Sequence, residues 1–258
     1  RKATSREAQL LSRMQHSNIV NYVESFSNNR ILHIVMGYAD GGDLAQAIEC
    51  QRRVSKPFAE EEVMRIFVQL CLALRHVHSH KILHRDLKSQ NVFLTKAGVV
   101  KLGDFGIAKL LDSSEACART QIGTPYYLSP ELCQDKPYGR SSDVWALGIL
   151  LYELLALKVP FQARNLAALV GKITTQEPPP IEGCRKSYSE EVLALMSSIL
   201  RKEPSERPTV NEVTHELLLL LLVLRYSNFK KMIIVAHIPF SLPPPPPPPP
   251  PLLLRPPP

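Results

Sequence analysis

The sequence is poor in glycine, with 11 glycines among 258 residues, and no two of them are spaced i, i+2. That spacing opens the G-x-G-x-x-G loops that bring backbone N–H groups close to phosphates, so no such loop is present. The five cysteines are scattered and include no Cys-x-x-Cys pair, which excludes the usual zinc spacings. A scattered, odd set of cysteines favours reduced thiols in the cytosol or the nucleus.

Long apolar runs are also missing. No uncharged stretch reaches the 18 or so apolar residues that cross a bilayer, and the first residues lack the apolar core of a signal peptide. We therefore expect no membrane partner. The net charge is +7, but residues 217–258 contain four basic residues and no acidic one, so +4 of it lies there. The basic balance is therefore weak evidence for nucleic acid, and we expect no nucleic-acid partner.

Residues 217–258 also contain 13 of the 23 prolines. Nine of them are consecutive, Pro243 to Pro251, and favour an extended polyproline II rod. Such a rod is either a spacer or a ligand for the aromatic grooves of SH3-type and WW-type modules. Six leucines, 217–222, precede it and could pack against a core, contact a partner or aggregate. We expect residues 217–258 to form a disordered tail.

The first 216 residues mix strand and helix patterns. NIVNYVESF and RILHIVM predict two strands around a turn at residues 27–29. From Glu60 the apolar residues recur at i, i+3, i+4 and i+7, which predicts a helix with one buried face. Asn91–Leu94 and Val99–Leu102 predict a hairpin. Further helices are expected near residues 3–15, 144–155, 166–173 and 189–200, and Ser141, Ser142 and Asp143 supply a start signal for the second of these.

Chemically active side chains gather in ILHRDLKSQN, residues 82–91, and in Asp104-Phe105-Gly106, which begins thirteen residues after Asn91. Asp86 and Asp104 supply carboxylates, Lys88 an ammonium and Asn91 an amide. Phosphoryl transfer needs this set, because a carboxylate orients the hydroxyl, a cation faces the phosphoryl group and hard oxygen ligands hold magnesium. Each residue alone has an ordinary structural interpretation as a turn cap, a strand-end cap or a surface charge. The joint spacing is what favours chemistry.

GTPYYLSPE at residues 123–131 and SDVWALG at residues 142–148 follow in order. With HRDLKSQN and DFG they resemble the eukaryotic protein kinases, over about residues 1–216. HSNIV, IVMGYADGGDL and KLGDFGIAKLL are most similar to the NIMA-related serine/threonine kinases. The resemblance implies an α+β, protein-kinase-like fold with a mostly helical C-lobe. It also implies ATP and Mg²⁺ as cofactors, and serine and threonine side chains of proteins as substrates.

The resemblance assigns site residues by their position in the motifs. Asp86 would accept the proton of the substrate hydroxyl, and Lys88 would face the γ-phosphate. Asn91 would complete the catalytic set and, with Asp104, hold magnesium. The nucleotide would also contact hinge and pocket residues, namely Met36, Gly37, Tyr38, Ala39 and Phe93. Gly37 stands where these kinases often have Glu, and its backbone freedom is expected to loosen the hinge.

Regulatory and structural roles follow from the same resemblance. Thr120 matches a phosphorylated threonine, and Arg85 is the cation that such a phosphate would engage. Glu7 would pair with a lysine on a strand. His84, Phe105 and Leu11 would form an apolar stack between the lobes. Asp143 would cap the backbone of the catalytic loop, and Glu131 would pair with Arg207.

Three segments are expected: residues 1–36 as an N-lobe remnant with a helix carrying Glu7 and two strands, residues 37–216 as hinge and C-lobe, and the tail. The Gly-rich loop and the strand lysine of kinases are missing, and that lysine would precede Arg1. We therefore expect little or no kinase activity from the 258 residues as given. The chain is either a fragment or alternative product of an active kinase, or an inactive kinase-like scaffold. The expected location is cytoplasmic, with centrosome, cilium and nucleus as further sites and a role in the cell cycle or the cilium.

Overall fold

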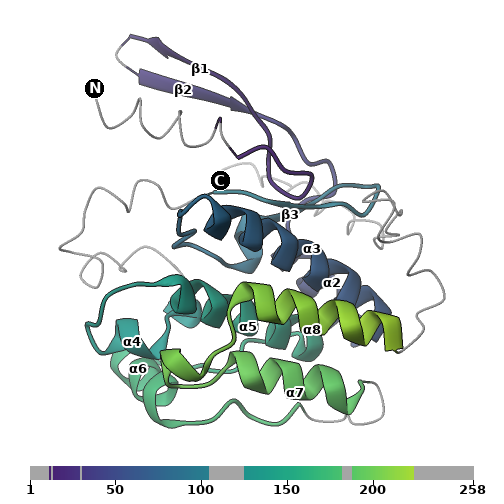
Figure 1. The fold of residues 1–258 in the computed structure, drawn as a ribbon, viewed down its shortest axis with the longest axis vertical. Coiled ribbons are helices and arrows are strands. Elements are labelled where there is room, and N and C mark those ends of the chain that lie inside the picture. The colour runs from purple at the N-terminus through teal and green to yellow at the C-terminus, as the bar shows by residue number, and fades with distance from the viewer. Residues whose placement is uncertain (1–11, 13, 30, 105–124, 182–187, 224–258) are drawn as a thin grey trace, which may run out of the picture.

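A β-hairpin lies above a larger, mostly helical body in the computed structural model (Figure 1). The structure describes residues 12, 14–29, 31–104, 125–181 and 188–223. Within these residues, the two small sheets and the helical body form the predicted α+β fold. The helix expected at residues 3–15 lies mostly outside them; Ser12 is helical, whereas Met14 and Gln15 are not.

The hairpin consists of β1 (Tyr22–Asn28) and β2 (Ile31–Met36), which pair antiparallel and confirm the two predicted strands. Asn29 in the turn has a φ of 48°, a left-handed conformation that Asn tolerates better than most residues. The segment before β1 fixes the hairpin to the body. Asn18 is buried there, and its Nδ2 donates to Gln69 Oε1 at 2.8 Å and to the Val100 carbonyl at 3.1 Å.

Two helices follow the hairpin, α2 (Leu44–Arg53) and α3 (Glu60–Ser79). Helix α3 is the predicted amphipathic helix, and three glutamates in its first turn complement the helix dipole. Helix α2 was not predicted. Asp43 caps it by accepting a hydrogen bond from Gln46 N at 2.8 Å, and Leu44, Ala47 and Ile48 are buried on one face.

A second hairpin, β3 (Val92–Leu94) and β4 (Val100–Leu102), confirms the strands predicted around Gly98. Gly98 has a φ of 78°, which glycine adopts without strain. The 3-10 helix η1 (Ser89–Asn91) precedes β3. Leu102 also bridges to Ile19 in parallel, so the segment before β1 lies beside β4.

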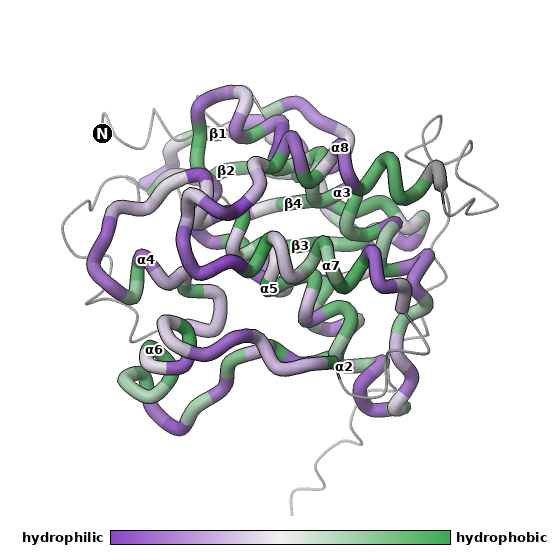
Figure 2. The backbone as a smooth tube through the Cα atoms, turned by 60° about the horizontal axis from the view of Figure 1, so that its bottom comes forward, coloured by the Kyte–Doolittle hydropathy of each residue, from purple (hydrophilic) through white to green (hydrophobic). Residues whose placement is uncertain are grey.

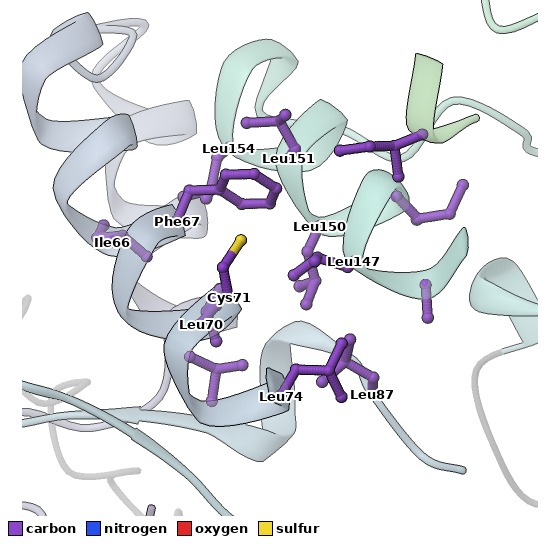
Figure 3. Packing of buried hydrophobic residues seen from close by; sticks show 14 of the residues in the cluster. Ile66, Phe67, Leu70, Cys71, Leu74, Leu87, Leu147, Leu150, Leu151 and Leu154 are labelled. Atoms are coloured by element: carbon purple, nitrogen blue, oxygen red, sulfur yellow. The ribbon is translucent and has the colours of Figure 1, made fainter. Parts of the chain in front are cut away.

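The lower body contains α4 (Pro130–Cys133), α5 (Arg140–Ala156), α6 (Leu166–Thr175), α7 (Glu190–Ile199) and α8 (Val210–Val223), with 3-10 helices η4 (Pro125–Tyr127) and η6 (Pro204–Glu206). Helix α5 is buried on nearly all sides, as expected of a helix that is hydrophobic all round. Figure 3 shows Phe67, Leu70 and Leu74 of α3 facing leucines of α5 across the core. In Figure 2, hydrophobic stretches of β3, β4 and α5 lie centrally and hydrophilic stretches lie at the periphery.

Helix α8 continues through Glu216 to Val223, so the expected boundary at residue 216 lies inside a helix. Leu217 and Leu221 are buried in the core, and α8 packs against α3. Of the alternatives for the leucine run, packing against the core therefore holds for these two leucines. Residues 224–258, including Pro243–Pro251, lie outside the described residues. Among the described helices, none has the length and apolar character needed to cross a bilayer.

Candidate active site

The three predicted catalytic side chains meet at the loop that joins α3 to β3. Asp86 Oδ2 accepts hydrogen bonds from Lys88 Nζ at 2.7 Å and from Asn91 Nδ2 at 2.9 Å. The same Nδ2 donates to the Asp86 carbonyl at 2.8 Å. Because both bonds use Nδ2, Oδ1 is the Asn91 atom with a lone pair to offer a cation. The loop therefore holds a carboxylate, a cation and an amide oxygen together.

Asp143 of α5 supports this loop from below, as the resemblance predicts. Its carboxylate is fully buried and accepts from His84 N at 2.9 Å and from Arg85 N at 3.0 Å. His78 Nε2, at 2.8 Å, and the Tyr138 hydroxyl complete four contacts. Burial alone would raise the pKa of Asp143, but the hydrogen bonds from His78 and Tyr138 outweigh burial and lower it. The carboxylate therefore stays ionised and fixes the loop backbone.

His84 links the loop to the segment that ends at Asp104. It is buried, and burial lowers the pKa of its imidazole, which is therefore neutral. Nε2 lies 3.1 Å from the Gly103 carbonyl and donates to it, because a carbonyl can only accept. Nδ1 is then the acceptor for Asp86 N at 3.4 Å. Gly103 N also donates to the Asn91 carbonyl at 3.0 Å, so Gly103 is tied to the loop on both sides.

Asp104 follows Gly103 directly. Its side chain is exposed, and its φ of 49° is uncommon for a residue with a Cβ. Gly103 thus brings two residues with side-chain oxygens close together, because its N–H is bonded to Asn91 and Asp104 is the next residue in the chain. An amide and one carboxylate, with phosphates and waters completing the shell, are the ligands that magnesium uses in phosphoryl-transfer sites. In the described part of the chain, we find no group of three or more His, Cys, Asp or Glu side chains that could hold a metal ion.

The expected nucleotide-binding residues lie at the end of the upper hairpin, directly after it, and on β3. Met36 ends β2 half-buried, Ala39 is also half-buried, and Tyr38 is 90% exposed. Gly37 N donates to the Asn21 carbonyl at 2.7 Å. A Cβ on Gly37 would come no closer than 3.6 Å to another residue, so its conformation does not require glycine.

Glycine is required just after the hinge. Gly41 N donates to the Leu94 carbonyl at 2.8 Å, and a Cβ there would lie 2.7 Å from that oxygen. The bridge between Asp43 and Phe93 continues this contact along β3. Phe93 is half-buried, and its ring lies close to Gly103, where an added Cβ would be 2.8 Å from Phe93 Cε2. The hinge side, Phe93 and the Asp104 segment are thereby brought together.

The predicted pair of Glu131 and Arg207 is present and buried. Arg207 Nη1 and Nη2 donate to the two carboxylate oxygens at 2.9 and 2.8 Å, and Ser142 Oγ donates to Oε1 at 2.6 Å. Burial would raise the pKa of Glu131, but the bonds from Arg207 and Ser142 lower it overall. Arg207 also donates to the carbonyls of Ser141, Arg201 and Lys202, so α4 is anchored to the body.

A cluster of Ser89, Tyr127 and Glu153 beside the catalytic loop was not predicted. The Tyr127 hydroxyl accepts from Ser89 N at 3.1 Å, lies 2.9 Å from Ser89 Oγ and donates to Glu153. Burial raises the pKa values of both Tyr127 and Glu153. Tyr127 lies in GTPYYLSPE, a motif that suggested the site but not this partner. The cluster joins the GTPYYLSPE motif to the catalytic loop.

Of the three residues with predicted regulatory roles, Glu7, Arg85 and Thr120, the structure describes Arg85. Arg85 has a φ of 66°, is half-buried, and its guanidinium lies 5.9 Å from the centre of the Tyr138 ring. Glu7, Leu11, Phe105 and Thr120 lie outside the described residues, so the ion pair of Glu7, the stack with His84 and the contact of Arg85 with Thr120 remain predictions.

Comparisons with known proteins agree with this geometry. The family described as "Protein kinase domain" matches residues 1–219. The serine/threonine-protein kinase Nek1 of Mus musculus is 51% identical over 213 residues, which cover 83% of this chain and 17% of Nek1. Nek5 of Homo sapiens is 49% identical over 214 residues, 83% of this chain and 30% of Nek5.

A solved structure, the crystal structure of Rad53 1-466 in complex with AMP-PNP, matches with a TM-score of 0.70 and 26% identity. The match covers 84% of this chain and 54% of the Rad53 chain. The chain thus spans less than a third of the length of Nek1 and Nek5. On these grounds the chain belongs to the protein kinase family, and within it the sequence is of the NIMA-related, or Nek, serine/threonine type.

Proposed function

We propose that this chain supplies the phosphoryl-transfer site of a serine/threonine kinase, which moves the γ-phosphoryl group of ATP to serine and threonine hydroxyls of proteins. The observation that carries the proposal is the contact of Asp86 with Lys88 and Asn91, on a loop fixed from below by Asp143. These contacts bring a carboxylate, an ammonium and an amide together, which supports their proposed roles as base, phosphate-facing cation and magnesium ligand.

The side chains divide the work according to their chemistry. Asp86 Oδ2 would accept the hydrogen bond of the substrate hydroxyl and orient its oxygen. Lys88, 2.7 Å from that oxygen in the structure, would turn toward the phosphoryl group and balance its negative charge. Asn91 and Asp104 would hold Mg²⁺, which when bound with ATP neutralises charge on the phosphates. Met36, Gly37, Tyr38, Ala39 and Phe93 would contact the nucleotide.

The finer assignments rest on the sequence. Phosphorylation of Thr120 would add about −1.5 to −2 charge opposite Arg85 and order the activation segment, residues 104–131. Pro243–Pro251 would bind SH3-type or WW-type modules, which a pull-down with and without these nine prolines tests. The family suggests cytoplasmic action at the centrosome, the cilium or the nucleus, in the cell cycle or in ciliary function.

The 258 residues contain no Gly-rich loop and no strand lysine. An inactive kinase-like scaffold is the second candidate function. Thermal shift with Mg-ATP separates the two. We expect no shift for the 258 residues, and a clear shift when the nucleotide-binding lobe of a Nek relative is joined to the N-terminus. No shift for either protein would support the scaffold.

The extended chain also tests the catalytic assignment. Asp86→Asn is expected to lower the rate of phosphorylation of a generic Ser/Thr substrate by about 10²- to 10⁴-fold, the usual effect of losing a general base. Lys96→Met, on an exposed residue outside the site, is the matched control and should leave the rate unchanged. Equal rates for Asp86→Asn and the unmodified chain would overturn the assignment.

A further inference from the structure

A cavity of about 150 Å³ lies between α4, the end of α6 and η6, apart from the catalytic loop. Pro130 and Pro204 form apolar walls, and Thr174 of α6 also contributes to the lining. The charged lining residues include Lys136, Lys202 and Glu203. Lys136 and Glu203 are exposed, whereas Lys202 is half-buried. Nothing in the proposed kinase mechanism uses this cavity.

Lys202 is held in an unusual setting for a lysine. Its Nζ donates to the Ile173 carbonyl at 2.8 Å. The same atom lies 4.4 Å from the centre of the Phe161 ring and 5.0 Å from that of Trp145. The amine is therefore fixed in position, with one carbonyl and two aromatic rings in place of part of its hydration.

Charged groups around Lys202 act in both directions. Arg207 lies over the same Trp145 ring, 5.0 Å from its centre, and repels a second cation. Glu177 and Cys133 favour the ammonium, and Glu203 lies on the same cavity wall. Glu131, also in the lining, is already paired with Arg207. Burial is the largest influence and lowers the pKa of Lys202 to about 8. The charge of Arg207 also lowers this pKa, whereas the charge of Glu177 raises it.

We propose that Lys202 is an acylation site, which takes a short uncharged acyl group from an acyl thioester into the adjacent cavity. The ammonium first gives a proton to solvent. The nitrogen lone pair then attacks the thioester carbonyl carbon, the C–N bond forms and the C–S bond breaks, and the sulfur leaves as a thiolate that takes up a proton. The amide nitrogen releases its second proton to solvent, and no redox partner is needed.

Two features favour this site over ordinary lysines. At pH 7.5 an amine with a pKa near 8 is about one quarter neutral, whereas a lysine near 10.5 is only about 0.1% neutral. The cavity of about 150 Å³ also has room for a small substituent, because one water occupies about 30 Å³ of liquid and an acetyl group, with three heavy atoms, needs roughly three times that volume. The proposal does not rest on the kinase activity.

The test uses the full chain, acetyl-coenzyme A as the acyl donor and mass spectrometry to measure acetylation at each lysine between pH 6.5 and 10. Lys136 on the rim of the same cavity is the matched control. At pH 7.5 we expect Lys202 to react at least about tenfold faster than Lys136, since part of the gain in neutral amine is offset by lower basicity. That ratio should fall toward pH 10. Equal rates at pH 7.5, or a ratio that does not change with pH, would overturn the proposal.

Two further measurements separate the site from a general surface effect. Lys202→Arg keeps a positive charge but removes the amine, so the total acetylation of the chain at pH 7.5 should fall by the share measured at Lys202, while the rate at Lys136 stays the same. An octanoyl group has four times as many carbons as an acetyl group and would fill far more of the cavity, so the preference for Lys202 over Lys136 should be smaller with an octanoyl thioester. A preference that persists with the long acyl group would contradict the role of the cavity.

Discussion

Asp143→Asn is the sharpest test of how the catalytic loop is held. Oδ1 accepts from Arg85 N and the Tyr138 hydroxyl, and Oδ2 accepts from His84 N and His78 Nε2. An asparagine replaces one of these oxygens by an NH₂ group, which cannot accept. Whichever way the amide turns, one backbone N–H of the loop faces another donor. The Tyr138 hydroxyl or the His78 ring can reorient or change tautomer, but the backbone N–H cannot.

The expected loss follows from these contacts. A buried N–H without an acceptor costs about 1–3 kcal/mol, and the remaining bonds lose the strengthening that the carboxylate charge gave them. Together we expect a loss of about 2–4 kcal/mol in the free energy of unfolding. At about 2–4 °C per kcal/mol for a domain of this size, the melting temperature should fall by about 4–16 °C.

Urea and thermal unfolding followed by circular dichroism measure this loss. Asp135→Asn is the matched control, because Asp135 is exposed and its φ of 55° suits asparagine. The control should change stability by less than about 0.5 kcal/mol, as surface substitutions usually do. If Asp143→Asn is as mild as Asp135→Asn, the loop is not held by Asp143 and the reasoning fails.

Three other results are expected. The folded-state pKa of Asp143 lies below its unfolded value, so the stabilisation by this carboxylate is present above about pH 4 and is lost as pH falls through the folded pKa. The difference in unfolding free energy between the unmodified chain and Asp143→Asn should therefore be constant above about pH 4 and become smaller below it. Gly148→Ala places a Cβ 2.6 Å from Ile199 Cγ2 and should destabilise by about 1–3 kcal/mol, whereas Gly171→Ala, with nothing within 4 Å, should stabilise by up to about 1 kcal/mol in the same urea titration. Arg207→Met leaves Glu131 buried without its cation and should cost about 3–5 kcal/mol; a double-mutant cycle with Glu131→Gln should show that most of this cost disappears when both charges are absent.

Much of the fold could be predicted from local sequence because the elements carry their own signals. Helix α3 has a long apolar period, and both hairpins have turn residues at positions where a left-handed φ is found. Helix α2 was missed because it has only 10 residues and its cap, Asp43, stands in a Gly-Gly-Asp stretch typical of a loop. The predicted start signal of α5 was also only approximate. The helix begins at Arg140, and Asp143 accepts bonds from the catalytic loop instead of capping its own helix.

The candidate site shows the same division between local and long-range information. Asp86, Lys88 and Asn91 lie within six residues, so their spacing carried the prediction. Ser89, Tyr127 and Glu153 are brought together across 38 and 64 residues, and no periodic pattern links such distant positions. The surroundings of Lys202 are equally long-range, since the carbonyl and the aromatic rings that fix it belong to residues 29 or more positions away. Contacts of this kind follow from packing, which the sequence pattern does not reveal.

The contacts also divide the site into two parts that can fail separately. The loop with Asp86 is fixed by Asp143 of α5 and by the bond of His84 to Gly103, all below the upper hairpin. The hinge residues depend instead on the upper hairpin, through the bond of Gly37 to Asn21, and on β3, through Gly41. In the extended chain, Asp143→Asn should therefore lower turnover while nucleotide affinity stays nearly unchanged. A large loss of Mg-ATP affinity in that variant would mean that the loop and the hinge side are coupled, for example through Gly103, which lies against Phe93 and is bonded to His84.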